Sequence, residues 1–393
     1  MADDASNNSA RRPKLSPTFR VFDSIAEITS QDWNRLAGTQ PFLQHAFLRA
    51  LEDTGCASLE TGWMPQHMTL WLGTYLVGAM PMYVKHHSYG EYVFDWGWAD
   101  AYERSGLSYY PKLLSAIPFT PVAGSRLLAE NDDCRKLLVV AAVNYARNAG
   151  LSSFHCLFPA ESERAIFEDA GLMIREGVQF HWTNPGYRNF EDYLAAMSHD
   201  KRKKIHQERR KIHERGIVFR HFTGAEITEQ DWSFFTDCYI NTYREHRSMP
   251  YLTLEFFIEL GRRMPDSVLL ILANDGNSDI AASLNIFDNE AIYGRYWGSQ
   301  QYFPGLHFET CYYQTIEFCI ARGIKTFEGG AQGEHKLARG FLPTKTYSAH
   351  WLAHPGFSGA IEEFLARESL HMRDYIGELN EHNPFKTSHQ NQE

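Results

Sequence analysis

Apolar and polar residues alternate along the first half of the chain in stretches that predict β-strands. Two of these stretches, Met68–Gly73 and Leu76–Lys85, follow each other closely and predict a hairpin. A third strand is expected over Tyr92–Trp98. A helix is expected from about Ser108 to Ala116, and the segment Pro118–Gly124 follows it.

The second half of the chain carries a similar pattern. Ser267–Ala273 and Ile280–Asp288 flank an Asn-Asp-Gly-Asn turn, which is a strong hairpin signal. Ala291–Trp297 predicts the next strand. A helix from about His307 to Ala321 and a short buried strand over Ile324–Phe327 complete this half. The order of elements is therefore the same in both halves.

A Trp-Gly pair ends the third predicted strand in each half, as Trp96-Gly97 and as Trp297-Gly298. The shared pair favours an internal duplication, and hence an α/β fold of two tandem lobes with mixed sheets flanked by helices. Each lobe then holds its own core, as expected for a chain of 393 residues. The predicted division is a disordered tail over residues 1–17, an N-terminal lobe over 18–185, a C-terminal lobe over 186–355 and a helical tail over 356–393.

Composition and charge exclude several classes of protein. Six scattered cysteines without a Cys-x-x-Cys pair argue against a disulfide framework and favour a reducing, cytoplasmic location. No apolar stretch approaches the roughly 18 residues of a membrane span. The net charge of −10 opposes general nucleic-acid binding.

One segment reverses that acidity. Between Asp200 and Arg215 there are eight Lys or Arg residues against three acids. A helix is expected over 199–215, with Ser198 as its N-cap. Four consecutive cations, Lys201 to Lys204, crowd its first turn, so an anionic ligand is one interpretation and a solvated charged face is the other. We take Lys201 and Lys204 as candidate ligand-binding residues.

The segment from Glu328 to Thr344 is dense in glycine and in titratable groups. Glycines let the backbone approach a ligand closely, and groups of both charge signs among them are typical of a reacting centre. The preceding strand is expected to lie parallel to the one that ends at Trp297, with their carboxyl ends at one crevice. A polar surface loop is the plain alternative.

Three motifs together resemble a known family. They are Val178-Gln-Phe-His-Trp, Lys201-Arg-Lys-Lys-Ile-His-Gln-Glu-Arg-Arg and Gly330-Ala-Gln-Gly-Glu-His-Lys-Leu-Ala-Arg-Gly-Phe-Leu-Pro. The chain resembles, over roughly 20–380, the Fem-AB-like predicted N-acyltransferases, which are related to the Fem aminoacyltransferases of peptidoglycan cross-bridges. The resemblance implies two lobes of the Gcn5-related N-acetyltransferase (GNAT) fold and transfer of an acyl group to a small-molecule or peptide amine.

Amide formation needs a base for the amine, stabilisation of the developing oxyanion and alignment of the reactants. Glu328 or Glu334 could act as the base, Lys336 or Arg339 could stabilise the oxyanion or bind a donor phosphate, and Tyr296 could protonate the leaving group. A covalent intermediate is disfavoured because the chain has no Gly-x-Ser-x-Gly motif. The candidate substrate-binding residues are Arg295, Trp297, Gly330, Gln332, Gly333, His335, Glu309, Lys201 and Lys204.

The donor stays open between acyl-CoA and aminoacyl-tRNA. The stretch Gln301–His307 departs from the pyrophosphate loop of acetyltransferases, which reads Arg or Gln-x-x-Gly-x-Gly or Ala, whereas Fem enzymes use aminoacyl-tRNA. A different class remains as the alternative, namely a non-catalytic module that binds a peptidoglycan fragment or another anionic ligand. A metalloenzyme is disfavoured, because the 18 histidines are dispersed and no His-Glu-x-x-His motif occurs. No metal is expected, and the oligomeric state is not predicted.

Overall fold

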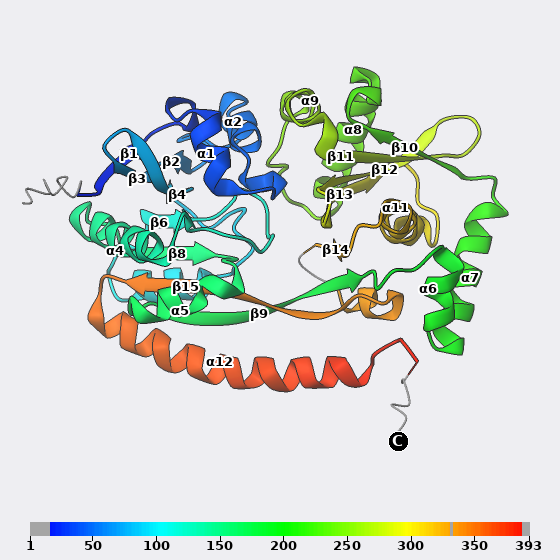
Figure 1. Cartoon of the computed structure of the whole chain (residues 1–393). Helices are drawn as coiled ribbons and strands as arrows, with labels where there is room; N and C mark the ends of the chain where they lie inside the picture. The colour runs from blue at the N-terminus through cyan, green and yellow to red at the C-terminus, as the bar shows by residue number, and fades with distance from the viewer. Residues whose placement is uncertain (1–15, 331–332, 387–393) are drawn as a thin grey trace, which may run out of the picture.

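The computed structural model describes residues 16–330 and 333–386, and its strands form two sheets (Figure 1). The smaller sheet has the order β1-β3-β4-β7, with strands at Thr18–Phe22, His67–Leu72, Tyr75–Met80 and Leu128–Ala129. The larger has eleven strands in the order β10-β11-β12-β13-β14-β9-β15-β8-β6-β5-β2. In chain order these are β2 Trp63–Pro65, β5 Tyr83–Lys85, β6 Lys112–Ser115, β8 Ser153–Leu157, β9 Met173–Thr183, β10 Val218–Thr223, β11 Val268–Asn274, β12 Asp279–Phe287, β13 Ala291–Ser299, β14 Thr326–Glu328 and β15 Leu342–Leu352.

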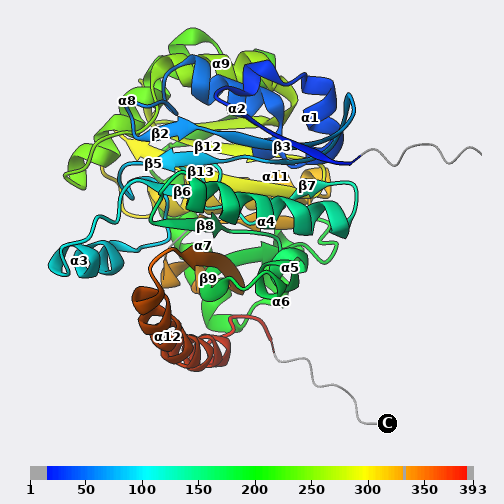
Figure 2. The same cartoon turned by 90° about the vertical axis from the view of Figure 1, so that its left-hand side faces the viewer.

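Helices lie on the faces of both sheets, so the α/β prediction is confirmed (Figures 1 and 2). They are α1 Ser30–Ala37, α2 His45–Asp53, α3 Trp96–Arg104, α4 Asp132–Asn148, α5 Arg164–Asp169, α6 Phe190–Ala196, α7 His199–His213, α8 Glu229–Glu245, α9 Leu254–Arg263, α10 Leu306–Phe308, α11 Gln314–Arg322 and α12 Pro355–Glu381. Within residues 16–330 and 333–386, none of these helices is long and apolar enough to cross a membrane.

Both predicted hairpins are confirmed, as β3–β4 and β11–β12, but the strand expected over Leu76–Lys85 ends at Met80, and Tyr83–Lys85 is the separate strand β5 of the larger sheet. The strand predicted over Tyr92–Trp98 is wrong, because Trp96 begins helix α3 and the residues before it form a loop. This loop turns Glu91 and Asp95 inward onto the fully buried ammonium of Lys112, whose Nζ lies 2.8 Å from Glu91 Oε2. The need to neutralise a buried cation therefore overrides the local alternation.

The helix predicted over 108–116 is also wrong. Lys112–Ser115 is strand β6, which pairs in parallel with β8 and in antiparallel with β5. All four of its residues are buried, and a run buried on both faces has no period that separates strand from helix. The duplication was thus inferred partly from two elements that are not present in the first half.

The parallel unit expected in the second half is confirmed. β13 and β14 pair in parallel and are connected by α10, a π-helical turn over Glu309–Tyr313, and α11. The first half contains a corresponding unit, in which α4 connects the parallel strands β6 and β8. In both cases one helix joins two neighbouring parallel strands, as right-handed crossovers do.

Two long strands join the halves by a reciprocal exchange. β9 leaves the first half to pair with β14, and β15 leaves the second half to pair with β8. The two also pair with each other along nine residue pairs, from Leu342↔His181 to His350↔Met173. β15, which the predicted division places in 186–355, therefore pairs on both sides with strands that precede residue 186. Helix α12 lies beneath both long strands (Figure 1).

Candidate active site

The parallel strands β13 and β14 separate beyond their paired residues and leave a gap between them. β14 pairs with only the first three residues of β13, whereas β13 continues to Ser299. At the point of separation β13 carries a bulge, so Arg295 has no opposite residue on β12. A crevice of about 130 Å³ lies in this gap, between Gly294–Trp297 and Gly329–Gly330. We call it the strand crevice.

Two larger cavities adjoin the strand crevice, and Trp297 lines all three. One, of about 410 Å³, lies between the two halves and is called the tyrosine cavity. Its tyrosines are Tyr92, Tyr239, Tyr243, Tyr251 and Tyr296. The other, of about 520 Å³, is lined by α8 and the β13–α10 connection and is called the loop cavity. The three together are large enough for a ligand of several parts.

Glu328 ends β14 beside the strand crevice with a carboxylate oxygen that has no hydrogen bond within the described residues. Burial raises its pKa to about 8, although the charges of Arg295 and Arg126 oppose that rise. His181 Nε2 lies 3.9 Å from Glu328 Oε2, but burial lowers the pKa of His181 to about 4, so this contact is not an ion pair. The Glu328 side chain is 13% exposed, but its unpaired Oε2 is buried, and it is the neighbouring Phe327, Gly329 and Gly330 that line the strand crevice.

Lys336 places a second unpaired charge at the same point. Its Nζ donates a hydrogen bond to the Gly330 carbonyl oxygen over 3.0 Å, and Gly330 lines both the strand crevice and the tyrosine cavity. No carboxylate of the described residues lies within ion-pair distance of Lys336. Burial lowers the pKa of the ammonium to about 8. Lys336 and Glu328 thus both lie next to the Gly329–Gly330 segment, each with a pKa of about 8.

The β13 residues Arg295, Tyr296 and Trp297 lie where the sequence predicts, around the crevice. Arg295 Nη2 donates to the Phe119 carbonyl oxygen over 2.5 Å. The Tyr296 hydroxyl donates to the same oxygen over 3.4 Å, and burial raises the pKa of this phenol. Trp297 packs against the ring of His307, at 5.1 Å between centroids.

Three candidates point away from the crevice because other groups hold them. Arg339 forms an ion pair of 2.9 Å with Glu208 on α7. Glu309 is buried against Arg209 of α7, at 3.0 Å. Glu334 is exposed and accepts a hydrogen bond of 2.6 Å from Tyr375 on α12. These three residues anchor the walls of the site, and we assign them no contact with substrate.

The other candidates also lie outside the three cavities. Lys201 and Lys204 are on α7 and line none of them. His335 is exposed and its Nε2 lies 3.2 Å from the hydroxyl of Tyr312. Gly333 adopts a positive φ of 120° as the loop enters the short helix 334–339, which explains a glycine there. Gln332 lies outside the described residues.

Several residues of the site carry no clear signal in the sequence. Asn285 lines the strand crevice with a buried Nδ2 that has no hydrogen-bond partner in the described structure. Tyr92 comes from the first half and is brought to the site only by the loop around Lys112. Tyr239 and Tyr243 lie one turn apart on α8, a spacing that also suits an ordinary core face.

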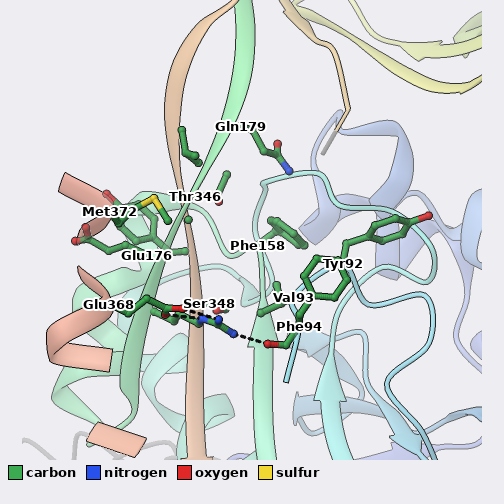
Figure 3. Close-up of a pocket in the computed structure, with 14 residues that line it drawn as sticks. Tyr92, Val93, Phe94, Phe158, Glu176, Gln179, Thr346, Ser348, Glu368 and Met372 are labelled. Carbon is green, nitrogen blue, oxygen red and sulfur yellow. Dashed lines mark hydrogen bonds and ion pairs between the residues drawn. The ribbon is translucent and has the colours of Figure 1, made fainter. Parts of the chain in front are cut away.

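A fourth cavity, of about 240 Å³, lies on the face of β9 and β15 (Figure 3). Arg175 crosses it, bound to Glu368 of α12 at 2.7 Å and to the Phe94 carbonyl oxygen at 2.7 Å. Tyr92 lines both this cavity and the tyrosine cavity. Tyr92 is therefore a wall shared by the two cavities. Among the described residues there is no cluster of three or more metal-ligating side chains.

The arrangement of two α/β units, each with two neighbouring parallel strands joined through a helix, is that of tandem GNAT-fold lobes. The C-terminal domain (DUF2156) of a protein described as a lysylphosphatidylglycerol synthetase from Agrobacterium fabrum matches at a TM-score of 0.54 and 9% identity, over 88% of this chain and 97% of that one. FemX matches at a TM-score of 0.54 and 12% identity, over 85% of this chain and 98% of that one. The L-PGS of Bacillus licheniformis matches at a TM-score of 0.51 and 9% identity, over 80% of this chain and 95% of that one. These similarities show the shared fold.

The family follows from the sequence of nearly the whole chain. The model of the FemAB-like family, described as peptidoglycan biosynthesis/recognition, matches residues 24–387. The chain belongs to this family, and the resemblance stated from the three motifs is confirmed. A search of curated proteins finds no match.

Proposed function

We propose that this protein is an amide-forming aminoacyltransferase that acts on an amine acceptor of peptidoglycan biosynthesis. The observation that carries the proposal is the position of two buried titratable groups, Glu328 and Lys336, beside Gly329–Gly330, the backbone segment that lines the strand crevice. Family membership and the fold shared with FemX support it. A module for recognition alone has no need of two buried, unpaired titratable groups at one point.

The reaction requires two proton transfers, one before the amine attacks the carbonyl carbon and one when the leaving group departs. The acceptor ammonium gives a proton to the Glu328 carboxylate, and the free amine attacks the carbonyl carbon of the donor ester or thioester. The carbonyl oxygen becomes negative and is stabilised by the Lys336 ammonium. The C–N bond then forms fully, the C–O or C–S bond breaks, and the second amine proton passes to the leaving oxygen or sulfur.

An aminoacyl ester on RNA suits the site better than a coenzyme A thioester. No Lys or Arg of the described residues lines the loop cavity, so a diphosphate there would have no cationic partner. In contrast, α7 packs on the wall of the site through its Glu208 and Arg209 and turns a cationic face outward. A shallow hollow of about 480 Å³ on that face is lined by His199, Arg202, Lys203, His206, Gln207 and Arg210.

The test is transfer from aminoacyl-tRNA and from acyl-CoA to cell-wall precursors, followed by mass spectrometry. We expect a new amide from the RNA-linked donor only. The double substitution Lys203→Glu and Arg210→Glu should raise KM for that donor and reduce its salt dependence, because phosphate contacts release counterions. Amide formation from acyl-CoA with unchanged rate in the double variant would overturn the choice of donor. Saturable binding of precursors without any product would favour the recognition module.

A further inference from the structure

Arg295 presents free hydrogen-bond donors to the tyrosine cavity. Of its N–H groups, only those at Nη2 form hydrogen bonds in the described structure, to the Phe119 carbonyl oxygen and to the Tyr296 hydroxyl at 3.4 Å. No carboxylate of the described residues lies within 4 Å of its guanidinium, although most other half-buried arginines here have such a partner. An arginine with unused donors in a cavity is a typical binding group for a carboxylate.

The walls of the tyrosine cavity suit the same chemistry. None of its lining residues within the described ranges is acidic, so nothing there repels an anion. Five tyrosines bring hydroxyl groups to its wall, and His246 lies at the exposed rim. Arg295 is the extra residue of the β13 bulge and has no opposite residue on β12. The backbone of the bulge therefore sets the direction of this side chain.

Glu328 supplies the complementary charge on the neighbouring strand. It is the last paired position of β14, opposite Tyr293, and Arg295 lies two residues further along β13. Arg295 lines both the strand crevice and the tyrosine cavity, and its charge acts on Glu328, although the two form no ion pair in the described structure. An acceptor with an ammonium and a carboxylate a few bonds apart would satisfy both groups at once.

We infer that the tyrosine cavity takes an amine acceptor that carries a carboxylate, with the carboxylate bound by Arg295 and the amine directed to Glu328 and Gly330. The ligand class is an amino acid or a peptide with a free carboxyl group. This inference rests on the proposed function for the role of the amine, but the recognition itself requires no donor and can be measured without one.

The test is isothermal titration calorimetry of the full chain, without donor, against glycine, lysine, Nα-acetyl-lysine and glycyl-lysine, each beside its carboxamide. At least one acid should bind, and about tenfold or more tightly than its amide. Binding of the free amino acids identifies an amino-acid acceptor, whereas binding of the last two acids alone identifies a peptide carboxylate. Equal binding of acids and amides, or no binding by any acid, overturns the inference.

Variants locate the effect. Arg295→Gln should abolish the preference for acids, Arg295→Lys should keep part of it, and Arg104→Gln on the exposed end of α3 should keep all of it. A preference that persists in Arg295→Gln overturns the assignment. If Arg295→Gln does not fold, the comparison of acids with amides on the unaltered chain and on Arg295→Lys still decides. Acid binding without transfer would contradict the proposed function alone, and transfer to amines that lack a carboxylate would contradict only this inference.

Discussion

The buried carboxyl of Glu328 should make the stability of the protein depend on pH. Its pKa is 4.5 in the unfolded chain and about 8 in the folded one, so the folded state holds the proton over a wider range. The free energy of unfolding should therefore be highest, as far as this group contributes, below about pH 4.5 and should fall as pH rises through about 8. Urea unfolding at about pH 5 and about pH 8.5 measures this decline. Glu328→Gln should flatten it, and an unchanged decline would contradict the raised pKa.

The same group should control the rate. A base must be ionised to accept a proton, so kcat/KM should rise with pH towards about 8, and Glu328→Gln should lose this rise together with about 100-fold in rate. An approaching ammonium lowers the pKa of the carboxyl, so the rise in kcat should lie at lower pH than the rise in kcat/KM. Glu334→Gln is the matched control, since Glu334 is exposed and bound to Tyr375. An equal loss in this control would contradict the assignment.

Lys336 should act on the transition state more than on binding. Its ammonium already lies at the Gly330 carbonyl oxygen, where a donor carbonyl would develop charge. Lys336→Met should lower kcat by about 100-fold with little change in KM. Steady-state kinetics of this variant and of Lys325→Met, an exposed lysine paired with Glu290, separate the effect from general loss of charge. A large rise in KM at constant kcat would assign Lys336 to binding instead.

At the scale of the element, α7 has one face that holds the fold and one that is free for a ligand. Arg209 pairs with Glu309, which is almost wholly buried, whereas the neighbouring Arg210 is exposed and lies 3.5 Å from Glu214. Arg209→Met leaves an uncompensated buried charge and should lower the free energy of unfolding by about 3 kcal/mol. Arg210→Met should change it by less than about 0.5 kcal/mol. Urea midpoints give both values, and similar losses in the two variants would contradict this division of the helix.

The elements that the sequence predicts well are those whose pattern is local. The β11–β12 hairpin follows from its Asn-Asp-Gly-Asn turn, and the Gly-rich segment after β14 follows from composition alone. The segments 92–98 and 108–116 could not be predicted in this way. Lys112 of the second segment is buried against Glu91 and Asp95 at the first, and local alternation in either segment contains no information about that contact.

The candidate site shows the same limit. Glu328, Lys336 and the β13 residues were predicted from the ends of two parallel strands, because topology alone brings such ends together. The sequence does not show that Arg339 and Glu309 are held by ion pairs, because their partners on α7, Glu208 and Arg209, lie 131 and 100 residues away. Tyr92 was missed because the contact between the lobes is not encoded in either lobe alone.

For the whole molecule, the two lobes share an architecture but only one crevice is open within the described residues. In the N-terminal lobe the corresponding strands β6 and β8 also pair over three residues. The space beyond them is filled by the lobe's own chain, with Gly124 bridged to Pro159 and with Arg126 fully buried. The Arg126 guanidinium donates to the carbonyl oxygens of Leu157 and Val122, which a ligand would otherwise contact. The pseudo-symmetry of the fold therefore does not extend to the chemistry.

The reciprocal exchange of β9 and β15 should make the two lobes a single folding unit. Without β15, the N-terminal lobe exposes the edges of both β8 and β9, whose long ladders with β15 are lost. A fragment of residues 16–185 should therefore be unfolded or aggregated by circular dichroism, and the full chain should unfold in one calorimetric transition. Co-expression of 16–185 with 186–386 should restore a complex, because the second fragment returns β15 to its place between β8 and β9. Two separate transitions in the full chain, or a folded monomeric 16–185 fragment, would show that the strand exchange joins lobes that are already stable, and the site between them would then be free to open as the lobes move.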